Sequence, residues 1–262
     1  MYPHHERALE SLKGYFSKEP GVIAVIFGGS VAKGLERPDS DIDAMIIVTD
    51  ERYEELKAQN QLAQVIFGYC DYEHGYFDVK YMTKGYLAAA ADHGSEPTRN
   101  SFLKSRCLMT SDPEIPALVE KVQTFQKQEK EKKQLSFYAA LSMNAGYFWH
   151  FIEDDPLLKA RTVSDIAFFT LRLLLEDQEA LFPCAKSLMQ TVERLEHKPE
   201  GILDRCREFL ENPCEQTREA FTQPVLEFIS FRPPEDSNKV LTRFVEDNEQ
   251  WWYKTRPLIA EW

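Results

Sequence analysis

Residues 22–48 read VIAVIF, GGSVAKGLERPDSDID and AMIIV in succession, and this stretch decides the fold class. The apolar runs Val22–Phe27 and Ala44–Val48 have the length and the β-branched content of buried strands. A Gly-Gly-Ser turn closes the first strand, and an Asp-Ile-Asp sequence opens the second. The stretch therefore predicts two strands joined so that backbone N–H groups, which bind phosphate, lie opposite a carboxylate pair, which binds a divalent metal.

The turn and the carboxylate pair each have the chemistry that a nucleoside triphosphate site needs. Gly28 and Gly29 permit a close approach of the backbone to a phosphate, and Ser30 offers both a hydroxyl and an N–H group. Asp41 and Asp43 are two residues apart in an extended segment, so their side chains point to the same side. Carboxylates arranged in this way supply the oxygen ligands that Mg²⁺ prefers.

A third carboxylate is expected on a later strand. Asp78 lies in residues 76–82, YFDVKYM, where most side chains are aromatic or aliphatic. A carboxylate in such a strand is unfavourable without a function, so we predict that Asp78 completes a two-metal site and acts as general base on an acceptor hydroxyl. The alternative is an ion pair between Asp78 and Lys80. Lys33 is a further candidate for phosphate contact, although an exposed lysine in a loop is usually only solvated.

Gly-Gly-Ser, ten intervening residues and Asp-Ile-Asp at the head of a strand resemble the signature of the DNA polymerase β-like nucleotidyltransferase superfamily. The pattern is similar to its small-substrate branch, which includes the antibiotic nucleotidyltransferases and the minimal nucleotidyltransferases. The resemblance implies a mixed sheet flanked by helices, with Gly29 and Ser30 on the triphosphate and Asp41 and Asp43 on metal. Asp78 matches the third carboxylate of the superfamily by its position on a later strand.

The hydrophobic pattern of the chain changes near residue 130, at the charged run 128–133, QEKEKK. Before it, helical and strand patterns alternate, and after it almost every apolar pattern has helical spacing. We therefore expect an α+β protein with a nucleotidyltransferase domain at 1–130 and an all-α bundle at 131–262. The individual patterns predict strands at 22–27, 44–48, 76–82 and 105–110 and helices at 7–16, 51–58, 86–90, 113–133, 135–152, 163–175, 181–195, 202–210 and 225–231.

The composition of the chain bears on the class of acceptor, on zinc binding and on where the protein is located. The chain has 262 residues and a net charge of −12, which argues against nucleic acid as the acceptor because phosphate neutralisation supplies most of that affinity. Its five cysteines show no zinc-ligand spacing. We see neither a signal peptide nor an apolar segment of membrane-spanning length, and we expect a cytoplasmic protein.

These observations predict an enzyme that uses two Mg²⁺ ions to move a nucleoside monophosphate, AMP from ATP or the equivalent from another triphosphate, to a hydroxyl. The acceptor would be a small molecule bound between the two domains, for which an aminoglycoside-like compound suits the acidic helical half. One alternative is a nucleotidyltransferase of the toxin–antitoxin type that modifies a protein or a tRNA. Another is a nucleotide-binding regulator without catalysis, although such a protein would be expected to lack one of the three carboxylates.

Overall fold

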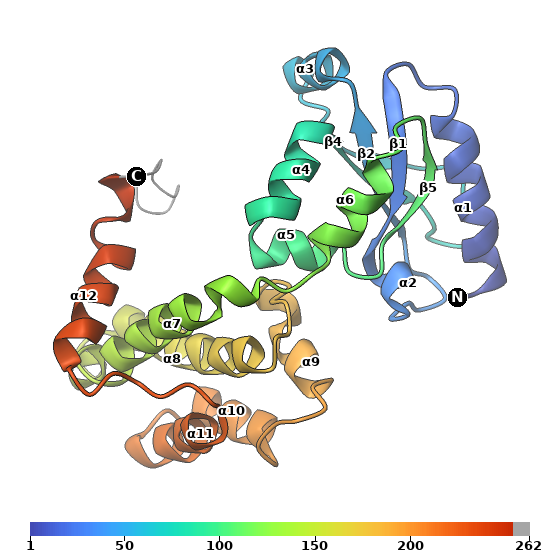
Figure 1. Ribbon diagram of the computed structural model, residues 1–262. Helices are drawn as coiled ribbons and strands as arrows, with labels where there is room; N and C mark the ends of the chain where they lie inside the picture. Colours follow the sequence, from blue (N-terminus) through green and yellow to red (C-terminus); the bar gives the residue numbers. More distant parts are fainter. Residues whose placement is uncertain (254–262) are drawn as a thin grey trace. The chain divides into compact units, whose positions relative to one another are not determined.

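The computed structural model describes residues 1–253, which divide into two compact units (Figure 1). The first unit is Met1–Phe125 and the second begins at Gln126, close to the predicted change at residue 130. Residues 254–262, the last part of the expected helical bundle, lie outside the described residues. Among residues 1–253, none of the helices combines the length and the apolar character that a membrane crossing requires.

A five-stranded sheet forms the centre of the first unit, in the order β3-β4-β2-β1-β5. β2 and β4 run parallel, and the other neighbouring pairs are antiparallel, so the sheet is mixed as predicted. The first strand occupies the predicted residues, and the second begins two residues earlier than predicted and includes Asp43. The strands are β1 (Val22–Phe27), β2 (Ile42–Val48), β3 (Ala63–Ile66), β4 (Phe77–Thr83) and β5 (Arg106–Thr110).

Helices cover both faces of this sheet because its strands carry apolar residues on both faces. Alternate residues of β1 and β2 pack with α1 into one core, and the intervening residues pack with α4 and α6 into a second core on the opposite face (Figure 1). The side chains of Thr49 and Thr83 begin α3 and α4 by accepting a hydrogen bond from the backbone N–H three residues ahead. The helices are α1 (Pro3–Phe16), α2 (Gly29–Lys33), α3 (Asp50–Ala58), α4 (Lys84–His93), α5 (Glu96–Ser101) and α6 (Ile115–Val122).

The predicted helix at 113–133 is wrong, because α6 ends at Val122 and α7 begins only at Lys130. Buried Arg99, on the unpredicted helix α5, supplies the physical reason. Its guanidinium donates hydrogen bonds to the carbonyls of Lys121, Val122 and Thr124, which satisfies the end of α6. This end is therefore set by a residue more than twenty positions away, which no local pattern reveals.

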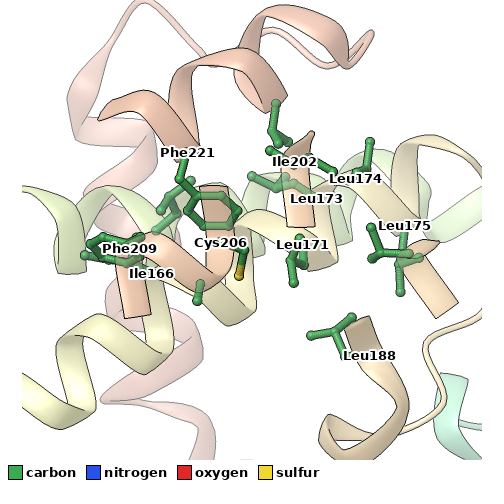
Figure 2. Close-up of a cluster of buried hydrophobic side chains, with 14 of the residues drawn as sticks. Ile166, Leu171, Leu173, Leu174, Leu175, Leu188, Ile202, Cys206, Phe209 and Phe221 are labelled. Atoms are coloured by element: carbon green, nitrogen blue, oxygen red, sulfur yellow. The ribbon is translucent and has the colours of Figure 1, made fainter. Parts of the chain in front are cut away.

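In the described residues of the second unit every secondary-structure element is a helix, as predicted. Ile166 and Leu173 of α8 meet Cys206 and Phe209 of α10 and Phe221 of α11 in one buried cluster (Figure 2). The α-helices are α7 (Lys130–Ala145), α8 (Pro156–Asp177), α9 (Leu188–Glu193), α10 (Ile202–Glu211), α11 (Glu215–Phe228) and α12 (Ser237–Asn248). Short 3₁₀ helices are η1 (Lys127–Glu129), η2 (Phe148–Phe151), η3 (Ala185–Ser187) and η4 (Trp251–Tyr253).

Several predicted boundaries in this unit are wrong. The helix expected at 135–152 ends at Ala145, whose carbonyl accepts a hydrogen bond from Arg218 of α11. The helix expected at 225–231 begins at Glu215, where Cys214 and Thr217 cap it, and it runs through Pro224. The segment 181–195 is helical only in η3 and α9, and α12 has no predicted counterpart.

Candidate active site

Three carboxylates meet at one end of the sheet in the first unit. One oxygen from each of Asp41, Asp43 and Asp78 lies within 4.8 Å of the others, and all three side chains are half-buried. This spacing allows all three to contact one divalent cation or to share a pair of cations. The sequence-predicted triad is thus brought together, and no ion pair joins Asp78 to Lys80 among the pairs formed by the described residues.

The strand register places Asp43 and Asp78. They are direct partners in the parallel pair β2–β4, so their side chains extend from the same face of adjacent strands. Asp41 lies just before β2, at the end of the loop that follows α2. That loop is held by the Tyr72 hydroxyl, which donates to the backbone oxygen of Ser40 at 2.8 Å. The His4 ring also contacts the Pro38 oxygen at 2.9 Å.

Gly29 permits the close approach between the small-residue turn and Asp43. Its φ is +72°, and a Cβ built on it would lie only 1.8 Å from Asp43 Oδ2. No other amino acid can occupy this position without moving the carboxylate or the turn. The next residue, Ser30, donates its backbone N–H to the same Asp43 carboxylate, and the Gly28 N–H donates to the Asp43 backbone oxygen at 3.0 Å.

The electrostatics of the site favour a bound cation. Burial and the negative charges of Asp41 and Asp78 raise the pKa of Asp43 to about 6, although Lys80 and the Ser30 N–H both act to lower it. The folded protein therefore resists ionisation of a carboxylate that a metal would need in its ionised form. A divalent cation among the three oxygens would remove this repulsion, so the residues present fit a hard metal ion.

Lys33, the last residue of α2, is oriented by a second element. Its Nζ donates to the Asn100 side-chain oxygen of α5 at 2.8 Å. Lys104, two residues before β5, donates from its Nζ to the backbone oxygen of Lys33 at 3.2 Å. Two ammonium groups thus gather at the end of α2, the segment that begins at Gly29.

The sequence predicts that Gly28, Gly29, Ser30 and the three aspartates form one site, and the structure places them together. The residues that support this site carried no assigned role in that prediction. Asn100 lies on a short helix without a local pattern, and Tyr72 lies in a loop. Tyr76 carried a usable signal because it is two residues from Asp78 and therefore shares its face of the strand. The charge of Asp41 raises the pKa of the Tyr76 hydroxyl, with burial and a hydrogen bond to Asp41 adding to the effect.

Comparison with known proteins agrees with this geometry. Residues 9–85 match a family model described as a nucleotidyltransferase domain, and no curated protein matches the sequence. Among solved structures, the chain is similar to a nucleotidyltransferase-like protein from Exiguobacterium sibiricum, with 8% identity, a TM-score of 0.46 and coverage of 98% of this chain and 83% of that one. It is also similar to the spectinomycin adenyltransferase AAD(9) from Enterococcus faecialis, described in complex with ATP and spectinomycin, with 12% identity, a TM-score of 0.34 and coverage of 92% and 97%. The turn and the three aspartates thus all lie within residues 9–85, the segment that is similar in sequence to a nucleotidyltransferase domain.

Proposed function

We propose that the protein is a magnesium-dependent nucleotidyltransferase that moves AMP from ATP to a hydroxyl of a small-molecule acceptor. The observation that carries the proposal is the meeting of Asp41, Asp43 and Asp78 directly beside the Gly29–Ser30 turn. A carboxylate cluster alone is common on protein surfaces. A carboxylate cluster in contact with a phosphate-binding turn, inside a nucleotidyltransferase domain, is suited to hold both the metal and the triphosphate.

In the proposed reaction the acceptor oxygen forms a bond to the α-phosphorus of ATP. The bond between that phosphorus and the oxygen bridging to the β-phosphorus breaks, and pyrophosphate leaves with the electron pair. Asp78 takes the proton of the acceptor hydroxyl. Two Mg²⁺ ions held by Asp41, Asp43 and Asp78 would supply charge stabilisation for the transferred group.

The remaining residues bind and orient the donor. Ser30 and the adjacent Gly28–Gly29 backbone hold the β- and γ-phosphates, and the Ser30 N–H exchanges its contact with the Asp43 carboxylate for a phosphate oxygen. Lys33 adds a positive charge at the other end of α2, where Asn100 fixes its direction. The donor would thus be held from its phosphate end while Asp78, on the neighbouring strand, remains available to the acceptor.

Incubation with [α-³²P]ATP, Mg²⁺ and a panel of hydroxylated acceptors that includes aminoglycosides and spectinomycin tests the proposal. The acceptor class rests on charge, since residues 135–262 contain 14 Lys and Arg against 22 Asp and Glu. We expect label on an acceptor, release of pyrophosphate, and loss of both in Asp41→Ala. Asp39→Ala is the matched control because Asp39 is an exposed acid of the same loop that pairs with Arg37 outside the triad. Transfer that survives in Asp41→Ala, or the absence of Mg²⁺-dependent transfer to every acceptor, would contradict the proposal.

A further inference from the structure

The two edges of the five-stranded sheet differ in how they are protected against pairing with another strand. At the β5 edge, an exposed Arg106 and an irregularity in the pairing with β1 both discourage a further strand. At the β3 edge, residues 58–70, AQNQLAQVIFGYC, contain no charged residue and no proline. Charged residues make up 28% of the chain, so the lack of protection is a local feature of β3.

The outer side of β3 presents backbone groups that are available for pairing. The Leu62 oxygen accepts a hydrogen bond from the Tyr81 N–H at 2.9 Å, so Leu62 directs its backbone groups toward β4. Because this direction alternates along an antiparallel strand, Ala63 and Val65 direct their N–H and C=O groups away from β4. Within residues 1–253, no hydrogen bond reaches these outward groups. They can therefore bind the backbone of a further strand.

The side chains of the outward residues are apolar and exposed. Val65 is 53% exposed, Phe67, directly after β3, is 69% exposed, and Ala63 is exposed at the preceding position of the same face. Single exposed apolar residues are ordinary on protein surfaces. Here they occupy successive positions on one face of an edge strand. Unpaired backbone groups together with such a row of side chains are suited to the addition of another strand.

We propose that the β3 edge pairs antiparallel with the β3 edge of a second copy of this chain. A two-fold axis at Val65 would place this residue opposite Val65 of the second copy, and Ala63 opposite Phe67 of the second copy. This register joins outward backbone groups to outward backbone groups and sets a small side chain opposite a large one. A second copy suits the edge better than an acidic or basic peptide, because β3 offers no charge to pair with one.

The dimer would set the two carboxylate triads in a defined relation. Val65 is the direct partner of Asp78 in the β3–β4 pair, so one row of side chains runs from Asp78 through both copies of Val65 to the second Asp78. Three strand spacings separate the two aspartates by about 14 Å. This distance exceeds the Debye length of about 8 Å at physiological salt, so the repulsion between the triads is largely screened. The pairing rests on the sheet edge alone and does not depend on the proposed function.

Sedimentation equilibrium of the full chain, from low micromolar to submillimolar concentration, tests the proposal. We expect a dimer that forms as the concentration rises, together with slower hydrogen exchange at the Val65 amide. Val65→Pro removes the outward N–H and keeps the ladder to β4, so it should raise the dissociation constant of the dimer by about tenfold or more. Circular dichroism would show that the variant keeps the fold of the wild type.

Charged substitutions test the position of the two-fold axis. Val65→Lys and Val65→Glu should each be monomeric, because like charges then lie directly opposite each other. An equimolar mixture of the two variants should form a heterodimer, because the charges are then opposite in sign. Tyr86→Lys is the matched control and should dimerise as the wild type does, since Tyr86 is an apolar residue of α4 that is 48% exposed.

Three results would overturn the inference. A wild-type chain that stays monomeric at every concentration would show that a second copy does not occupy the edge. A wild-type dimer that Val65→Pro and both charged variants leave unchanged, with no slowing of exchange at the Val65 amide, would place the interface elsewhere. A mixture of the two charged variants that stays monomeric would contradict the register in which Val65 lies opposite itself.

Discussion

Gly29 leaves no room for a side chain beside the Asp43 carboxylate. A methyl group on Gly29 would overlap the Asp43 carboxylate, and Gly29 also has a backbone conformation that favours glycine. Gly34, at the other end of α2, has the same φ of +72° but open space around the position of a Cβ. The two glycines therefore separate the effect of backbone strain from the effect of crowding the carboxylate.

We expect Gly34→Ala to lower the free energy of unfolding by about 1–2 kcal/mol, the cost of a left-handed alanine. Gly29→Ala should carry that cost and also displace Asp43, so its affinity for Mn²⁺ should fall by about tenfold or more. Urea denaturation and Mn²⁺ titration measure the two quantities. Equal Mn²⁺ affinities in the two variants would contradict the account of the turn.

The pKa of Asp43 predicts how stability depends on pH in the absence of metal. Asp43 has a higher pKa in the folded protein, about 6, than in the unfolded chain. Its contribution to the free energy of unfolding is therefore fully present at a pH below the unfolded pKa, and it is lost as the pH rises through about 6. Asp43→Asn removes the ionisation. The variant should therefore be more stable than the wild type at pH 8, by up to about 3 kcal/mol for a shift of about two pK units, and equal to it near pH 4.

Denaturation at the two pH values, with and without Mg²⁺, tests this prediction. Mg²⁺ should stabilise the wild type at pH 8 and leave Asp43→Asn nearly unchanged. Asp39→Asn is the control, since the hydrogen bond from Arg37 lowers the pKa of Asp39 and its replacement should give no gain at pH 8. A stability difference between wild type and Asp43→Asn that is the same at both pH values would show that Asp43 is not perturbed by its neighbours.

At the scale of elements, the strands around the site could be predicted and several helix ends could not. The apolar run Val22–Phe27 is bounded by turn residues on both sides, so neighbouring residues in the sequence determine where the strand begins and ends. Thr83 likewise begins α4 through its own side chain. The end of α6 depends on Arg99, and the end of α7 depends on Arg218, both distant in sequence. At these two ends the prediction failed because a remote side chain satisfies the helix terminus.

The loop that carries Asp41 is an element whose support can be removed selectively. Tyr72→Phe deletes the hydroxyl that donates to the Ser40 oxygen and keeps the ring. We expect a loss of about 1 kcal/mol in the free energy of unfolding and an Mn²⁺ affinity lowered by about threefold or more, because Asp41 is then held less firmly. Tyr69→Phe is the control in the same loop, since the ring contacts of Tyr69 with Tyr15 and Phe77 need no hydroxyl. Equal metal affinity in the two variants would contradict a positioning role for Tyr72.

At the scale of the whole molecule, each unit contains its own core. Both apolar clusters of the sheet and the three carboxylates lie within residues 1–125, whereas the cluster around Ile166 and Phe209 lies in the second unit. The site for the nucleotide donor could be predicted because most of its residues are close in sequence, within 28–43. Asp78 could be added because it is a carboxylate in an otherwise apolar strand. No comparable run of neighbouring residues marks the acceptor side, so the acceptor could not be predicted in the same way.

We expect residues 1–125, expressed alone, to unfold cooperatively and to bind Mn²⁺ with an affinity close to that of the full chain. The fragment has the size of an ordinary domain and keeps every contact described at the triad. Circular dichroism during urea denaturation and Mn²⁺ titration would measure this. A fragment without a cooperative transition, or one that folds and does not bind Mn²⁺, would contradict the independence of the first unit.

The most direct test of the proposed metal and nucleotide site is the binding of Mn²⁺ together with α,β-methylene-ATP, measured by electron paramagnetic resonance. We expect the nucleotide analogue and Mn²⁺ to strengthen each other's binding, and we expect Asp41→Asn and Asp78→Asn each to weaken Mn²⁺ binding by about tenfold or more while Asp39→Asn does not. Mn²⁺ binding that is independent of the nucleotide, or that is unchanged in both triad variants, would contradict it.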